Sequence, residues 1–67
     1  MNKNIMIEIV ENIVESADTI KKQKSVDDQD YGQLLAYAEC LSIIRDACSA
    51  YNLSEIGLDF DIDKRYL

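Results

Sequence analysis

The chain has 67 residues, with 13 acidic side chains against 7 basic ones and a formal net charge of −6. A chain of this length forms one domain, and it buries only about 60% of the surface that its unfolded form exposes, so it usually needs a disulfide, a metal or a partner subunit. The acidic balance leaves no basic footprint with which to bind nucleic acid directly.

Residues 4–24 are predicted to form the first helix. Their apolar residues recur at helical spacing, and most acidic residues take the opposite side. Glutamates in the first half and lysines at the far end suit the two poles of the helix dipole. The inward stripe consists of Met6, Ile9, Val10, Ile13, Ala17 and Ile20.

The connection KSVDDQDYG is rich in residues that start helices. Asp30 with Gln33, or Ser25 with Asp28, would form a capping box. The acidic cluster here and the preceding KKQK cluster are therefore interpreted as signals of a helix start and a helix end, not as binding sites.

Residues 28–51 are predicted to form a second helix with two apolar rows. The first row has heptad spacing: Leu34, Tyr37, Leu41, Ile44, Cys48 and Tyr51. The second row is made mostly of small residues: Ala36, Cys40, Ile43, Ala47 and Ala50. A single partner helix cannot cover both rows. We therefore expect an all-α antiparallel two-helix hairpin that dimerises into a four-helix bundle.

The heptad row is assigned to the intramolecular seam and the second row to the interface, although the two assignments could be exchanged. Tyr37 and Tyr51 are further interface candidates.

Residues 52–67 are predicted to form a short extended arm. Asn52 is expected to end the second helix in the left-handed conformation, and SEIG to form a turn that Gly57 closes. Apolar residues then alternate with aspartates, as in an extended segment with one buried face. The arm would lie along the helices or pair with its copy in another chain. A calcium loop is not expected, because Lys64 stands where that pattern needs glycine.

No catalytic, cofactor-binding or metal-ligating residue is predicted. The chain has no histidine, and a helix would hold Cys40 and Cys48 about 12 Å apart, too far for a disulfide or a shared zinc ion. Without histidine as a base and without an evident cleft, we do not expect an enzyme. Free thiols and the lack of a signal peptide favour a cytoplasmic protein, and no uncharged apolar stretch is long enough to enter a membrane.

The stretches YGQLLAYAECLSIIRDA (31–47) and IGLDFDID (56–63) resemble small uncharacterised proteins carried on integrative conjugative elements of Gram-positive bacteria. This resemblance implies an accessory role on a mobile element and brings no active site with it. The length and the hairpin are also similar to the short two-helix aspartyl-phosphate phosphatases, but their SQELD signature has no counterpart in this chain.

The sequence therefore favours a non-enzymatic protein–protein interaction or regulatory module that acts as a small helical homodimer and can present a surface to another protein. Two alternatives remain open. One is an acidic DNA-mimic decoy that binds a basic protein, supported by nine acidic residues in positions 27–67. The other is a helical regulator of a phospho-signalling enzyme.

Overall fold

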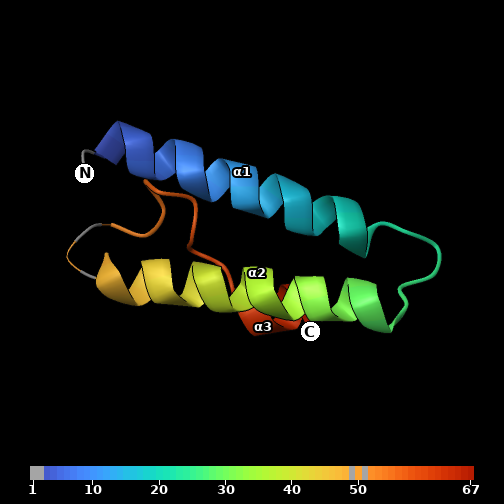
Figure 1. Ribbon diagram of the computed structural model, residues 1–67. Coiled ribbons are helices and arrows are strands. Elements are labelled where there is room, and N and C mark those ends of the chain that lie inside the picture. The colour runs from blue at the N-terminus through green and yellow to red at the C-terminus, as the bar shows by residue number, and fades with distance from the viewer. Residues whose placement is uncertain (1–2, 49, 51) are drawn as a thin grey trace.

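The structure, a computed structural model, describes residues 3–48, 50 and 52–67. Within these residues there are three helices, α1 (Lys3–Lys21), α2 (Asp28–Ala47) and α3 (Ile62–Tyr66), and no strand. The two long helices pack side by side in opposite directions, joined by a loop at one end (Figure 1). The predicted all-α class and the helical hairpin are thereby confirmed.

The inner side of α1 carries the predicted apolar stripe. Val10, Ala17 and Ile20 are buried, and Met6 and Ile13 pack half-buried against them. The helix ends at Lys21, three residues earlier than predicted. Residues 22–29 are all exposed, so continuing the helix would bury no further apolar surface.

The first turn of α2 is held by a capping box that joins Asp27 and Asp30. The backbone N–H of Asp30 donates to Oδ1 of Asp27 at 2.8 Å, and the N–H of Asp27 donates to Oδ2 of Asp30 at 3.4 Å. The capping box was therefore predicted in the right place but with the wrong pairs of residues. Both acids lie where the helix dipole stabilises negative charge.

The second helix ends at Ala47, four residues earlier than predicted, with Cys48 as its C-cap. Asn52 does not end it in a left-handed conformation, since no described non-glycine residue has positive φ. Instead, Oδ1 of Asn52 accepts hydrogen bonds from the backbone N–H and the hydroxyl of Ser54, which turns the chain back. Beyond this turn, Ile56 and Leu58 are buried in the core.

The C-terminal segment (52–67) is not the extended arm that its alternating pattern predicts. It forms a turn that Gly57 closes with φ of 80°, and it then enters α3, whose N-cap is Asp61. Leu58 and Ile62 are buried as the alternation requires. Helix formation from Ile62 also brings Tyr66 to the same side, because residues four apart lie on one face of a helix.

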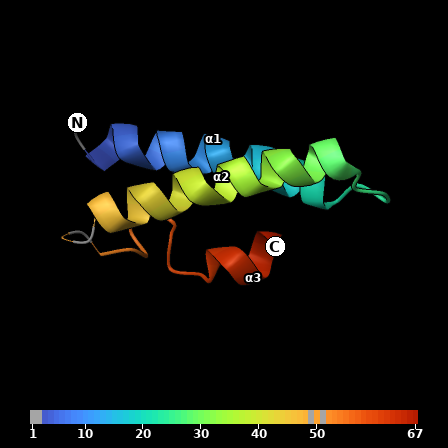
Figure 2. The ribbon, with the colours of Figure 1, turned by 60° about the horizontal axis from the view of Figure 1, so that its bottom comes forward.

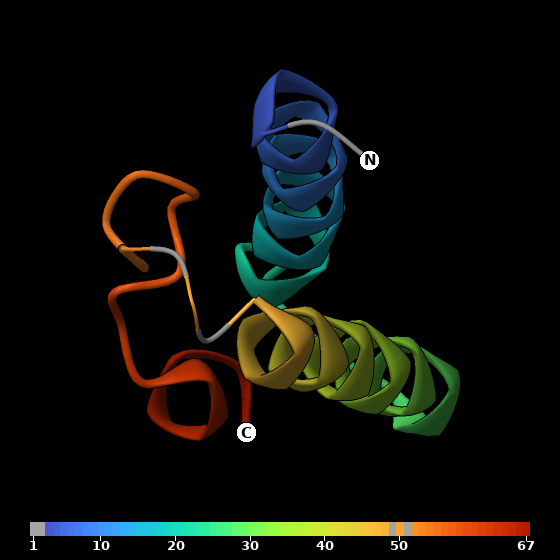
Figure 3. The same cartoon turned by 90° about the vertical axis from the view of Figure 1, so that its left-hand side faces the viewer.

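The C-terminal segment covers a third side of the hairpin. Figure 2 shows α3 lying alongside α2, and Figure 3, which looks along the hairpin, shows α1, α2 and the C-terminal segment at three corners. All three contribute to one apolar core: Val10, Ala17, Ile20, Leu34, Ala38, Leu41, Cys48, Ile56, Leu58, Ile62 and Tyr66.

Candidate interaction surface

The heptad row of α2 faces the inside of the molecule. Leu34 and Leu41 are 1% and 0% exposed, and Cys48 is also buried. Tyr37 and Ile44 are half-buried and pack against the same core. The assignment of this row to the intramolecular seam is therefore confirmed. Tyr37 belongs to the seam, and Tyr51 lies outside the described residues.

The second predicted apolar row faces solvent, and we call it the outer row: Ala36, Cys40, Ile43, Ala47 and Ala50. Its first four members lie on α2, whereas Ala50 follows the end of that helix. All five residues are exposed, and Ile43, at 67%, is the most exposed large apolar side chain of the described residues. Cys40 carries an exposed free thiol, in contrast to the buried thiol of Cys48. Coverage of this row by a second copy, as the sequence predicts, remains a prediction.

A groove of about 430 Å³ lies beside the outer row, between α2 and the C-terminal end of the chain. Its lining is mainly apolar and comes from five residues of α2 and two from the C-terminus: Leu35, Ala38, Glu39, Ser42, Ile43, Asp63 and Leu67. Ile43 is therefore shared between the outer row and this groove, which we call the α2–α3 groove. Sequence reasoning missed the groove because Leu67 reaches α2 only when residues 62–66 are helical.

Asp18 of α1 fixes α3 against the hairpin. Its Oδ2 accepts a hydrogen bond from Nη2 of Arg65 at 2.8 Å, and its Oδ1 accepts one from the hydroxyl of Tyr66 at 2.9 Å. The guanidinium of Arg65 also lies 4.6 Å from the ring centroid of Phe60, within range of a cation–π contact. The sequence offered only a weak signal for this cluster, namely the four-residue spacing of Ile62 and Tyr66 after a capping aspartate.

The surroundings of Tyr66 favour its neutral form. Burial of the ring, followed by the hydrogen bond to Asp18 and the negative charge of that carboxylate, raises the pKa of Tyr66 to about 12, while Arg65 acts in the opposite direction. The phenol is therefore a structural donor across the neutral range.

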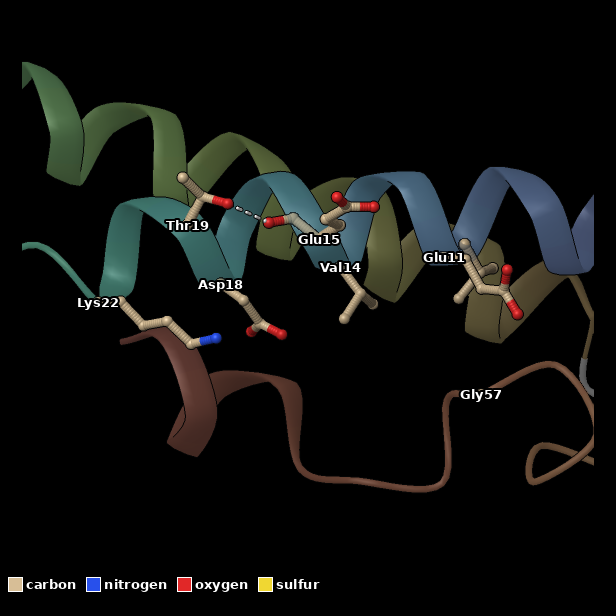
Figure 4. Close-up of a pocket in the computed structure, with 8 residues that line it drawn as sticks. Glu11, Val14, Glu15, Asp18, Thr19, Lys22 and Gly57 are labelled. Atoms are coloured by element: carbon tan, nitrogen blue, oxygen red, sulfur yellow. Dashed lines mark hydrogen bonds between the residues drawn. The ribbon is translucent and has the colours of Figure 1, made fainter.

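A second groove, of about 450 Å³, lies between α1 and the turn at Gly57. Its lining residues include three acids of α1, Glu11, Glu15 and Asp18, together with Lys22. Figure 4 shows Asp18 and Lys22 reaching from α1 toward the C-terminal segment. Asp18 is already bound by Arg65 and Tyr66, so this carboxylate of the groove serves the fold.

The described residues form neither a metal site nor a membrane-spanning helix. Across residues 3–48, 50 and 52–67, no group of three or more His, Cys, Asp or Glu side chains is placed to hold a metal ion. None of the three described helices combines the length and the apolar character needed to cross a membrane.

Comparison with known proteins adds no relative to this picture: no family model, no curated protein and no solved structure matches the chain.

Proposed function

We propose that this protein is a non-enzymatic protein–protein interaction module that associates with a second copy of itself through the outer row of α2. Two hairpins joined in this way make a four-helix bundle. The observation that carries the proposal is the position of Ile43, which is 67% exposed on the side of α2 opposite its buried row.

The composition of the outer row suits close packing of two helices. Ala36, Cys40 and Ala47 are small and exposed around Ile43, so a second helix can approach closely enough to bury the isoleucine. In a two-fold dimer each contact occurs twice. Burial of an isoleucine side chain is worth about 1.5–3 kcal/mol, whereas association costs at least about 4 kcal/mol of lost translational and rotational freedom. We therefore expect a dimer that dissociates on dilution.

The distribution of charge supports a role without catalysis. No charged side chain is buried among the described residues. The pKa values of catalytic acids and bases are usually shifted by surroundings that exclude water. The described carboxylates of this protein do not lie in such surroundings.

Substitution of Ile43 by Asp tests the proposal. A carboxylate enclosed in the interface of both copies should weaken association by at least about 100-fold, because an unpaired buried charge costs several kcal/mol. The substitution should leave the helical circular dichroism spectrum unchanged, since Ile43 is exposed within one chain. Sedimentation velocity across a dilution series measures the association.

The matched control is Ile5→Asp, which makes the same change at a residue of α1 that is 47% exposed. This variant should associate like the unmodified chain. If Ile43→Asp and the unmodified chain have the same mass at every concentration, α2 does not provide the interface.

A further inference from the structure

Exposed apolar side chains gather around the α2–α3 groove. Six large apolar residues remain exposed in the described part of the chain, and three of them, Leu35 (39%), Ile43 (67%) and Leu67 (46%), line this groove. Tyr31, which is 49% exposed, precedes Leu35 by four residues and so lies on the same side of α2. Clusters of this kind on a small protein mark interaction sites more often than isolated exposed residues do.

The floor of the groove has the geometry that receives a side chain from another helix. Leu35, Ala38, Glu39 and Ser42 occupy positions i, i+3, i+4 and i+7 of α2, the four positions that surround an inserted side chain in helix–helix packing. Ala38 leaves space at the centre, and Leu67 forms the opposite wall. A volume of about 430 Å³ accommodates an apolar side chain and part of the helix that carries it.

The charges at the groove identify the kind of partner. The two charged residues that line it are both acidic, Glu39 from α2 and Asp63 from α3. Of the two basic residues that follow Asp63, Lys64 does not line the groove, and Arg65 is bound to Asp18 of α1. A second copy of this chain would bring the same two acids to the contact, and like charges placed opposite one another weaken association.

We propose that the α2–α3 groove binds an amphipathic helix of another protein, which inserts a leucine-sized apolar side chain and places Lys or Arg next to Glu39 and Asp63. The inference extends the proposed interaction function to a second partner and does not require self-association, because only Ile43 belongs to both surfaces. The partner helix is apolar on one face and basic beside that face.

A fluorescent synthetic peptide of about 18 residues, with leucine along one helical face and lysine elsewhere, provides the probe. The full chain is titrated into it, and fluorescence anisotropy reports binding. A second peptide has the same leucines but glutamate in place of lysine. We expect the leucine–lysine peptide to bind at least about tenfold more tightly, and its affinity to fall as salt is raised.

Two pairs of variants locate the site. Leu35→Ser should weaken binding of the leucine–lysine peptide about tenfold through loss of apolar contact. Val26→Ser is its control, because Val26 lies in the linker with nearly the same exposed fraction, 38% against 39%. Glu39→Gln should weaken binding about threefold, whereas Glu8→Gln on α1, which removes the same charge, should not.

Methyl NMR spectra of the unmodified protein give a readout that does not depend on how the variants fold. Added peptide should shift the methyl signals of Leu35, Ala38 and Leu67. Shifts confined to Val10 and Val14 would place the peptide in the groove along α1 and overturn the proposal. Equal affinity for both peptides, or equal effects of Leu35→Ser and Val26→Ser, would also overturn it.

The two proposals fail in different ways. Leu35→Ser lies outside the outer row, so it should sediment like the unmodified chain while losing peptide affinity. If Leu35→Ser loses self-association, a second copy of the chain occupies this groove. That result contradicts the inference and places the dimer interface at the groove. If the unmodified protein self-associates but does not bind the leucine–lysine peptide, only the proposed groove function is contradicted.

Discussion

The short C-terminal segment contributes about as many residues to the core as either long helix of the hairpin does. The two long helices, 19 and 20 residues in length, each provide three buried apolar residues. The segment after residue 52 has a helix of only five residues, yet it provides four: Ile56, Leu58, Ile62 and Tyr66. Two packed helices cover only the side that each turns to the other, and apolar surface beside their contact stays open. A short segment that lies against both helices at this place buries a large share of its side chains. Regular secondary structure is therefore a poor guide to which part of this chain holds the fold together.

The largest effect is expected for Tyr66→Ala, which tests the contribution of the C-terminal segment to the core. Tyr66 is fully buried, and its truncation should lower the free energy of unfolding by about 3–5 kcal/mol, comparable to the whole stability of a chain of this size. Urea unfolding followed by circular dichroism measures the loss. Tyr31→Ala, the same change at a residue that is 49% exposed, should cost less than about 1 kcal/mol. Similar losses at both positions would mean that the C-terminal segment lies outside the core.

A smaller effect is expected at alkaline pH. The pKa of Tyr66 is raised to about 12, above the value of 10.0 that an exposed tyrosine has. The contribution of the neutral hydroxyl to the free energy of unfolding is therefore complete below pH 10. It is lost as the pH rises toward 12, because in this interval Tyr66 loses its proton in the unfolded chain but keeps it in the folded one. We expect a loss of about 2 kcal/mol over this interval, after allowance for solvent screening.

The Tyr66→Phe variant isolates this contribution from the general alkaline destabilisation of an acidic chain. It lacks the ionisable hydroxyl, so its free energy of unfolding should fall less steeply above pH 10 than that of the unmodified protein. Parallel pH profiles for the two proteins would show that the hydroxyl of Tyr66 is not buried against Asp18.

The hairpin could be predicted because its signals are long and repeated. Leu34 and Leu41 belong to a heptad row that persists over most of α2, and a row of that length excludes a strand. The heptad row was correctly assigned to the inside of the hairpin, but the spacing alone left an exchange of the two rows open, since it is the same in both. Ala38, which belongs to neither row, is buried on the same side of α2 as Leu34 and Leu41, and it lines a groove together with Asp63 and Leu67 of the C-terminal segment.

The C-terminal segment was predicted less well because its signals are short. Leu58, Phe60 and Ile62 alternate with aspartates, and three repeats fit an extended segment as well as a turn that leads into a helix. The decisive residue is Asp61, which caps α3 and accepts a hydrogen bond from the backbone N–H of Lys64 at 3.1 Å. The α2–α3 groove depends on this helix, so the error in the arm also concealed the groove.

The smallest effects come from the two capping aspartates, and they test whether both regions unfold together. Asp27→Ala removes the cap of α2 and should cost about 1 kcal/mol, and Asp61→Ala should cost about 0.5–1 kcal/mol. Because α3 holds Tyr66 in the core, we expect both variants to shift the same single urea transition without changing its slope. Asp59→Ala, at an exposed aspartate that caps no helix, is the control and should leave the midpoint unchanged. If Asp61→Ala instead speeds amide hydrogen exchange only in residues 62–67, α3 opens by itself, and the two regions are separate units of stability rather than one.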